Sequence, residues 1–345
     1  MISSPLDSLS LITFKEWMRK YNNYAIVTHI SPDGDAIGSS LALFLFLIGK
    51  GKNARVIVPN AFPDFFRWMP MIGNVVQYDI HKSQAEQILD QAEVICCLDF
   101  NGMKRIDALG EAVVARSQAR TLLLDHHPFP ENGFDLMFSH PEMCATAELI
   151  FRFITAIGSL NDINRDCATC IYTGMMTDTG GFTYNSNRSE IFTIISQLLS
   201  KGIDKDYIYR RIFNSNSEGR MRLMGYTLYS KMKLYPELRT ALIWLSQEEL
   251  KQFGYVKGDT EGFVNLPLQI KGIIFACFLR EDKTMIKVSL RSVGKFSCTE
   301  FASKIYNGGG HRNASGGEFY ESMEKAIARF EEGLEEFRPL LVAKK

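Results

Sequence analysis

The chain of 345 residues is long enough for two domains, since a domain usually contains about 100–200 residues. Hydrophobic residues make up 46% of it and charged residues 23%, which supports buried cores and excludes extended disorder or a collagen-like fold. The 39 basic residues balance the 39 acidic ones, which argues against a protein that binds long nucleic acids through a broad cationic face. The charge is unevenly spread: residues 1–200 carry 15 Lys/Arg and 21 Asp/Glu, whereas residues 201–345 carry 24 and 18. An acidic first half and a basic second half suit a metal site followed by an anion-binding domain.

Short apolar runs alternate with helical patterns through the first half of the chain, which predicts an α/β fold with a parallel sheet. The predicted strands are Tyr24–Thr28, Ala54–Val58, Val94–Leu98 and Thr121–Leu124. The predicted helices are Ala36–Ile48, Ser83–Gln91, Lys104–Ser117, Thr146–Ile157 and Asp166–Met176. We place this first domain at residues 1–200.

The second half of the chain begins with a helical pattern and then changes class. Helices are predicted at Ile191–Leu199, Tyr207–Phe213 and Arg220–Lys231. Beyond Pro236, strands are predicted at Thr240–Leu245, Gly272–Leu279 and Met285–Leu290, with a short helix at Phe301–Ile305 and a closing helix at Ser322–Leu341. We place a helical connector at residues 201–234 and a smaller mixed α/β domain at residues 235–345.

The cysteines and the apolar runs indicate the compartment. Seven cysteines without a disulfide spacing favour a reducing environment. Cys167 and Cys170 form a C-x-x-C without a second pair, so we interpret them as core residues rather than as a zinc site. The first ten residues lack the pattern of a signal peptide, and the longest apolar run, Leu41–Ile48, is too short to span a membrane. We expect a cytoplasmic protein with no membrane partner.

Acidic and imidazole side chains follow three of the predicted strands and end one predicted helix. They are His29, Asp33, Asp35, Asp99, Asp125, His126, His127 and Asp178. Each alone is explained as a helix cap or a turn residue. Because the carboxyl ends of parallel strands meet at one edge of a sheet, however, the set should converge, and converging carboxylates need cations to neutralise them. The set predicts two divalent metal ions, Mn²⁺ first, with Mg²⁺, Co²⁺ or Zn²⁺ as alternatives, in an arrangement that hydrolyses phosphate esters.

A glycine run in the second domain predicts a phosphate-binding site. Gly308, Gly309 and Gly310 lack side chains, so successive backbone N–H groups can turn toward one anion and form a nest. His311 and Arg291 would add charge-assisted hydrogen bonds. A flexible glycine loop beside an ordinary strand is the alternative interpretation.

The ordered motifs of the whole chain resemble those of the DHH phosphoesterase superfamily. They are H-x-x-P-D-G-D at 29–35, an aspartate at position 99, D-H-H at 125–127 and T-D-T-G-G at 177–181. The G-G-G-H at 308–311 resembles the signature of the DHH-associated C-terminal domain in its nuclease-type form. In size and domain content the chain is most similar to the group of nanoRNases and pAp phosphatases. That resemblance implies substrates such as short oligonucleotides (nanoRNA) and 3′-phosphoadenosine 5′-phosphate (pAp).

The resemblance also implies a role for each motif residue. One ion would bind His29, Asp33 and Asp99, and the other would bind Asp35, Asp99, His126 and Asp178. Asp99 would then bridge the two ions. Asp125 would orient a ligating histidine, His127 would face the scissile phosphate or the leaving oxygen, and a water activated by both metals would attack.

Other functions share part of this pattern. A cyclic di-AMP or pApA phosphodiesterase has the same motifs, and a RecJ-like exonuclease would need a groove for single strands that a neutral chain hardly supports. A DHH-type inorganic pyrophosphatase should lack the signature at 308–311. A nucleotide-binding sensor without catalysis would be expected to have lost metal ligands. Substrate length, base preference, cleavage direction, the ion used in the cell and the oligomeric state, a homodimer included, are not encoded by the motifs.

Overall fold

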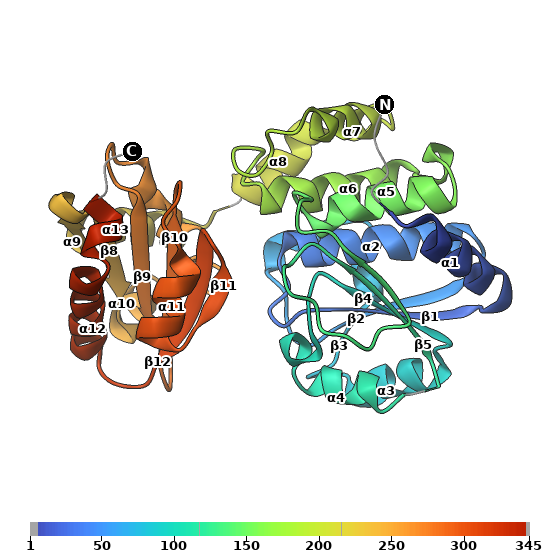
Figure 1. Ribbon diagram of the computed structural model, residues 1–345, viewed down its shortest axis with the longest axis horizontal. Helices are drawn as coiled ribbons and strands as arrows, with labels where there is room; N and C mark the ends of the chain where they lie inside the picture. The colour runs from blue at the N-terminus through green and yellow to red at the C-terminus, as the bar shows by residue number, and fades with distance from the viewer. Residues whose placement is uncertain (1–5, 117, 215, 343–345) are drawn as a thin grey trace. The chain divides into compact units, whose positions relative to one another are not determined.

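The structure is a computed structural model that describes residues 6–116, 118–214 and 216–342 (Figure 1). The chain divides into two compact units, Met1–Ser215 and Asn216–Lys345. The predicted fold class is confirmed, because the first unit contains a parallel sheet and the second a mixed sheet. The region expected to form a connector is divided between the units: α8 (Lys205–Phe213) lies in the first and α9 (Glu218–Ser230) in the second.

The sheet of the first unit has six parallel strands in the order β3-β2-β1-β4-β5-β6. They are β1 (Asn23–Thr28), β2 (Asn53–Val58), β3 (Val75–Gln77), β4 (Val94–Leu98), β5 (Arg120–Asp125) and β6 (Leu136–Ser139). The four predicted strands are confirmed, and β3 and β6 are short edge strands that the pattern missed. The chain runs from β1 outward to β3 and then returns to β4 on the other side of β1. Ligands bind at such a switch in an open parallel sheet.

Helices cover both faces of this sheet (Figure 1). They are α1 (Ser8–Lys20), α2 (Gly34–Gly49), α3 (Lys82–Gln91), α4 (Ala108–Val114), α5 (Thr146–Ile157), α6 (Arg165–Asp178), α7 (Ser189–Leu199) and α8. Alternate residues of β1 point to opposite faces: Ile26 packs in the core under α2 and α5, and Val27 in the core under α3 and α4. The helix predicted at Lys104–Ser117 is a 3₁₀ turn, η3 (Met103–Ile106), followed by α4, and Ser117 lies outside the described residues.

Glycines let α2 and α6 pack unusually close together. A Cβ at Gly38 of α2 would lie 2.6 Å from the carbonyl oxygen of Cys170, and one at Gly174 of α6 would lie 2.9 Å from Oδ1 of Asp35. Cys167 and Cys170 face this core, and all seven cysteines are free and buried. The two helices carry Asp35 near the start of α2 and Asp178 at the end of α6. The close contact therefore sets the separation of these two carboxylates.

Gly38→Ala is expected to destabilise the first unit by about 1–3 kcal/mol, because the added methyl group overpacks the contact between α2 and α6. Gly49→Ala in the same helix is the matched control, since nothing lies within 4 Å of a Cβ there. Urea unfolding of both variants measures the difference. Equal stability of the two variants would show that the contact tolerates a larger separation.

The sheet of the second unit has the order β11-β12-β10-β9-β8-β7 and is antiparallel except between β8 and β9. Its strands are β7 (Met232–Tyr235), β8 (Thr240–Leu245), β9 (Phe275–Glu281), β10 (Ile286–Ser292), β11 (Gly309–His311) and β12 (Ala314–Phe319). Its helices are α9, α10 (Gln247–Gln252), α11 (Cys298–Tyr306), α12 (Met323–Glu336) and α13 (Arg338–Val342). The predicted closing helix is thus two helices that meet at Phe337.

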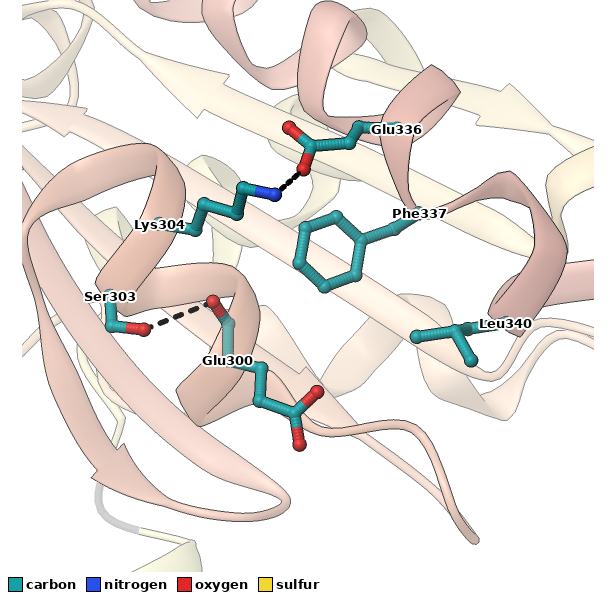
Figure 2. Close-up of a pocket in the computed structure, with 6 residues that line it drawn as sticks. All are labelled: Glu300, Ser303, Lys304, Glu336, Phe337 and Leu340. Carbon is teal, nitrogen blue, oxygen red and sulfur yellow. Dashed lines mark hydrogen bonds and ion pairs between the residues drawn. The ribbon is translucent and has the colours of Figure 1, made fainter.

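The two faces of this second sheet differ. Leu290 and Phe275 pack with Phe301 of α11 and Phe330 of α12 on one face. On the other face, Phe278 packs in a core with Phe263 of the 3₁₀ segment η6 (Phe263–Gln269). A shallow pocket lies where α11 approaches α12 and α13, and its lining contains none of the predicted site residues (Figure 2). Among the described residues, no helix is long and apolar enough to cross a membrane.

Candidate metal centre

Acidic and imidazole groups gather at the carboxyl ends of β1, β4 and β5, which are neighbours in the sheet. Three groups of ligand atoms each lie within 4.8 Å of one another. The first group contains His29, Asp33 and Asp99. The second contains Asp35, His126 and Asp178, and the third contains Asp99, His126 and His127. The structure therefore brings together all six side chains predicted to bind metal.

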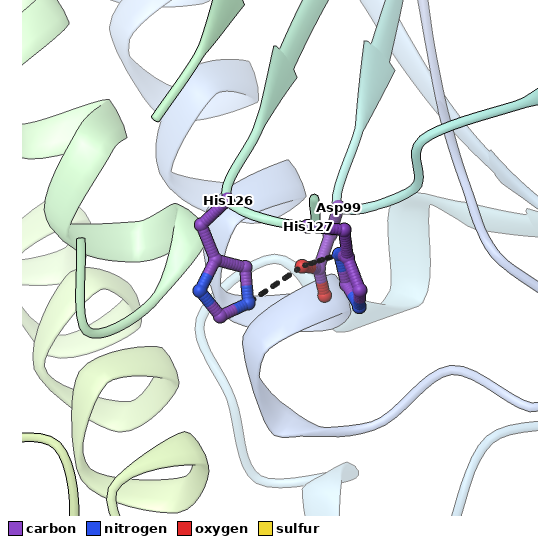
Figure 3. A group of neighbouring side chains, drawn as sticks. All are labelled: Asp99, His126 and His127. Carbon is purple, nitrogen blue, oxygen red and sulfur yellow. Dashed lines mark ion pairs between the residues drawn. The ribbon is translucent and has the colours of Figure 1, made fainter. Parts of the chain in front are cut away.

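Asp99 lies between the two sets of ligands and directs a different oxygen to each. Its Oδ2 is 3.5 Å from Nε2 of His29, whereas its Oδ1 is 3.7 Å from Nε2 of His126 and 3.8 Å from Nδ1 of His127. Figure 3 shows the two histidine rings on opposite sides of the Asp99 carboxylate. Asp99 adopts φ +65°, a left-handed conformation that aspartate tolerates better than most residues. The turn after β4 thus presents both oxygens of one buried carboxylate.

The second set of ligands surrounds Nε2 of His126. This atom lies 3.9 Å from Oδ2 of Asp35 and 3.6 Å from Oδ2 of Asp178. Nδ1 of His126 lies 3.3 Å from the carbonyl oxygen of Met143, and Nδ1 of His29 lies 2.9 Å from that of Ile30. Because a carbonyl accepts the Nδ1 hydrogen of each ring, both Nε2 atoms are directed to the carboxylates, the orientation required of a metal ligand.

Helix ends hold two of the acidic residues in place. Asp33 caps α2, and its Oδ1 accepts the N–H groups of Asp35 and Ala36. Asp178 is the last residue of α6, which ends in a Schellman motif: Gly180 donates to the carbonyl of Thr177, and Gly181 donates to that of Met176. Gly180 has φ +56°, so the glycine of the T-D-T-G-G motif is required by the helix end that presents Asp178.

The start of α5 also contributes to the site, through hydrogen bonds to two of the carboxylates. This contribution was not predicted from the sequence. Asp35 accepts the backbone N–H groups of Thr146, at 2.6 Å, and of Ala147, at 2.8 Å. The hydroxyl of Thr146 donates to Oδ1 of Asp99 at 2.8 Å. Thr146 therefore contacts carboxylates of both ligand sets. The only sequence signal was its place at the beginning of a predicted helix.

A buried charge network lies directly behind this segment. Glu148 of α5 is fully buried, and its carboxylate accepts from the N–H of Cys144 at 2.9 Å and from Arg152 at 2.8 and 3.0 Å. Arg188 donates to the same carboxylate at 2.5 Å, and Glu190 accepts from Arg152 at 2.8 Å. The network ties residues 143–148 to α7, and through them it supports the groups that contact His126, Asp35 and Asp99.

Asp125 and His127 form a pair of their own. Oδ1 of the fully buried Asp125 lies 2.7 Å from Nδ1 of His127. The sequence analysis expected Asp125 to orient a metal-ligating histidine, but the histidine it contacts is the one assigned to the substrate side. The physical reason is that the Nδ1 of His126 already bonds to the carbonyl of Met143. Oδ2 of Asp125 is buried, and none of the residues that the structure describes forms a hydrogen bond to it.

Burial and mutual repulsion change the acidity of the crowded carboxylates. Burial, and then the charges of Asp99 and Asp178, raise the pKa of Asp35 well above its usual range. Burial likewise raises the pKa of Asp178 to about 6, although His126 opposes the shift. Burial alone would lower the pKa of His29, but Asp33 and Asp99 outweigh it and raise this pKa to about 10. Without cations the centre therefore holds protons, and the donor set fits divalent ions that replace them.

Binding of Mn²⁺ is expected to tighten as pH rises through about 6, because a metal must displace the proton that Asp178 holds below that pH. The raised pKa of His29 acts in the same direction up to about pH 10. Isothermal titration in buffers of different ionisation enthalpy measures both the affinity and the protons released. An affinity that is independent of pH, or proton uptake on binding, would contradict this assignment.

Three of the predicted substrate residues, Arg291, Gly309 and His311, lie on one face of the second unit's sheet. Arg291 of β10 pairs with Ala314 of β12, which pairs with His311 of β11, so the two cationic candidates are two strands apart on the same face. Ser289, Gly316 and Gly309 form the next such row. This face is opposite the one that packs on α11 and α12, because Leu290 belongs to that core.

The glycine run differs from the nest that was expected. Residues Gly309–His311 form an edge strand, in which alternate N–H groups point toward β12 and away from it, so successive N–H groups do not converge on one anion. The glycines instead permit close backbone packing. A Cβ at Gly308 would lie 1.9 Å from the carbonyl oxygen of Gly316, and Gly310 has φ +142°.

Both units of the chain are similar to known proteins. Residues 23–175 match the model of the DHH family, N-terminal domain, and residues 241–337 match that of the DHHA1 domain. The crystal structure of an exopolyphosphatase-related protein from Bacteroides fragilis is 53% identical, with a TM-score of 0.96 over 99% of this chain and 100% of that one. The bifunctional oligoribonuclease and PAP phosphatase NrnA of Thermus thermophilus is 29% identical over 291 residues, 84% of this chain and 82% of that protein.

A more distant structure shares the fold alone. RecJ from Thermus thermophilus in complex with Mn²⁺ is 13% identical, with a TM-score of 0.56 over 97% of this chain and 55% of that one. The fold and the Asp/His cluster define a hydrolase built around a metal centre. The chain belongs to the DHH family of phosphoesterases, with a DHHA1 domain as its second unit.

Proposed function

We propose that the protein hydrolyses short oligonucleotides and pAp with two divalent metal ions, of which Mn²⁺ is the expected one. The observation that carries this proposal is Asp99, a buried carboxylate with one oxygen toward His29 and the other toward His126. The similarity to the oligoribonuclease and PAP phosphatase of Thermus thermophilus over most of both chains supports the substrate class.

The side chains of the centre divide into two ligand sets that share Asp99. His29 and Asp33 would hold one ion with Oδ2 of Asp99, and Asp35, His126 and Asp178 would hold the other with Oδ1. Two bound ions would polarise the phosphoryl oxygens and supply a nucleophilic water near neutral pH. Thr146 keeps the Asp99 carboxylate in the orientation that serves both sets.

His127 is proposed as the general acid for the leaving oxygen. Its Nδ1 donates to the buried carboxylate of Asp125, so Nε2 is the atom that can deliver a proton. In the second unit, Arg291 and His311 are proposed to hold a terminal phosphate of the substrate, because a guanidinium matches phosphate geometry.

The test is hydrolysis of pAp and of RNAs of two to five residues by the Mn²⁺-loaded protein. Activity on either that is lost in Asp99→Asn supports the proposal, and no activity on either overturns it. His127→Ala should slow the hydrolysis of a dinucleotide by about 10²–10⁴-fold. It should affect bis(p-nitrophenyl) phosphate far less, because nitrophenolate leaves without a proton. Equal losses on both would assign His127 to binding instead.

A second candidate is release of phosphate from inorganic polyphosphate. It is favoured by the relative from Bacteroides fragilis, which is described as exopolyphosphatase-related. The same assay with polyphosphate, cyclic di-AMP and pApA distinguishes the functions. Preference for polyphosphate would replace the nucleotide proposal, and preference for cyclic di-AMP, or for pApA over every other dinucleotide, would assign the enzyme to cyclic-dinucleotide turnover.

A further inference from the structure

Helix α8 carries aromatic side chains that are exposed to solvent on different sides of the helix. Tyr207 and Tyr209 are 42% and 48% exposed, whereas Ile208 between them is buried and anchors the helix. Arg210 and Arg211 follow them and are also exposed. Aromatic rings interleaved with arginines are the usual composition of a surface that binds single-stranded nucleic acid.

Two of the rings on α8 reach the segment that follows Asp178. The rings of Tyr209 and Phe213 lie one helical turn apart, with centroids 4.9 Å from each other. A Cβ at Gly181 would lie 3.8 Å from the ring of Phe213 and 3.9 Å from that of Tyr209. Gly181 is three residues beyond Asp178, a separation of at most about 11 Å along the chain. The rings therefore lie beside the segment that leaves the metal centre at Asp178.

The remaining ring of this helix is held rather than mobile. Tyr207 packs edge-to-face on Trp68, with ring centroids 5.5 Å apart, and the guanidinium of Arg211 lies 5.9 Å from the centroid of the Tyr207 ring. Trp68 precedes Met69, which is buried in the core of the first unit. These contacts anchor α8, so Tyr209 and Phe213 stand on a helix that is already fixed and lose little conformational entropy when a base stacks on them.

We propose that Tyr209 and Phe213, with Arg210 beside them, form a stacking subsite for a nucleobase of the substrate whose phosphate lies at the metal centre. The inference rests on the proposed function and extends it: the subsite would favour substrates of two or more nucleotides over a single nucleotide such as pAp. Stacking tolerates every base because each has an aromatic face, so little sequence preference is expected.

The test measures binding without hydrolysis. A fluorescein-labelled RNA trinucleotide is titrated with the full chain in EDTA, and anisotropy gives its affinity. Tyr209→Ala and Tyr209→Leu should weaken binding about 5- to 150-fold, whereas Tyr209→Phe, which keeps the ring, should bind like the unaltered protein. Tyr229→Ala on α9, where the side chain is 93% exposed, is the control and should change nothing. With Mn²⁺, Tyr209→Ala should lower kcat/KM for the trinucleotide relative to pAp.

Each outcome separates this inference from the proposed function. Hydrolysis of the trinucleotide with unaltered affinity in Tyr209→Ala would overturn the subsite and leave the function intact. Binding that depends on the ring, without hydrolysis of any nucleotide, would overturn the function and leave the subsite intact. A lower molar mass of Tyr209→Ala in solution would overturn the subsite too, because the face would then be a contact between two copies.

Discussion

Asp99→Asn is expected to abolish stabilisation by Mn²⁺ and to reduce phosphoester hydrolysis by about three orders of magnitude or more. Both ligand sets use this carboxylate, so its loss removes a negative charge from both metals at once, and metal ions contribute several kcal/mol to stabilising the transition state. Asparagine is chosen because it tolerates the φ of +65° at this position, where alanine would add backbone strain. Melting curves with EDTA and with Mn²⁺, together with initial rates, measure both effects.

The control for this variant is Asp107→Asn. Asp107 is also an aspartate with positive φ, 49°, but it is exposed at the start of α4 and lies outside the three ligand groups. The Asp107→Asn variant should keep the Mn²⁺-induced rise in melting temperature and the hydrolysis rate of the unaltered protein. Retained Mn²⁺ stabilisation in Asp99→Asn would mean that the ions do not depend on Asp99.

Glu148→Ala is expected to lower the free energy of unfolding of the metal-free protein by about 3–5 kcal/mol, because it leaves Arg152 buried without its main partner. It should also weaken Mn²⁺ binding about 10- to 100-fold, the usual cost of losing a group that orients metal ligands. The cause is the freed N–H of Cys144, in the segment that contacts His126 and Asp35. Urea unfolding in EDTA measures the free energy of unfolding, and calorimetric titration measures the affinity for Mn²⁺.

A double variant separates the structural role of Glu148 from its role in positioning the site. Glu148→Met with Arg152→Met replaces the buried pair by apolar side chains, which should recover much of the stability. The Mn²⁺ affinity should stay low, since Cys144 still lacks its acceptor. Recovery of both the stability and the Mn²⁺ affinity would contradict a positioning role.

The control for the buried ion pair is an exposed one. Asp64→Ala breaks the ion pair between Asp64 and Arg67, whose side chains are 72% and 65% exposed, and it should lower the free energy of unfolding by about 1 kcal/mol at most.

Much of the metal centre could be predicted without knowing the order of the strands in the sheet. His29, Asp99 and His126 each follow a buried parallel strand, and parallel strands end at the same edge whichever neighbours they have. Their convergence therefore follows from local patterns. Asp178 is different, since it ends a helix: the strand argument does not place it, and it was grouped with the others by its residue type and by the resemblance to a known family.

Thr146 and Glu148 could not be predicted, because their sequence context is that of an ordinary amphipathic helix. A glutamate four residues before an arginine suggests a solvent-exposed pair, yet Glu148 and Arg152 are both buried. Their burial arises because α7 covers them and supplies Arg188 and Glu190. The glycine run at 308–310 was misread for a similar reason: the partner strand β12 also contains glycines, and the close approach of the two backbones depends on that pairing.

The sequence by itself determined the α/β class, the positions of the main strands and the identity of the acidic and imidazole residues at their ends, because these depend on local periodicity and residue chemistry. Only the tertiary structure decided which oxygen of Asp99 faces which histidine, that Asp125 serves His127, and that α5 completes the site with Thr146. These contacts join residues from different strands and helices, and their geometry follows from helix packing that no local pattern encodes.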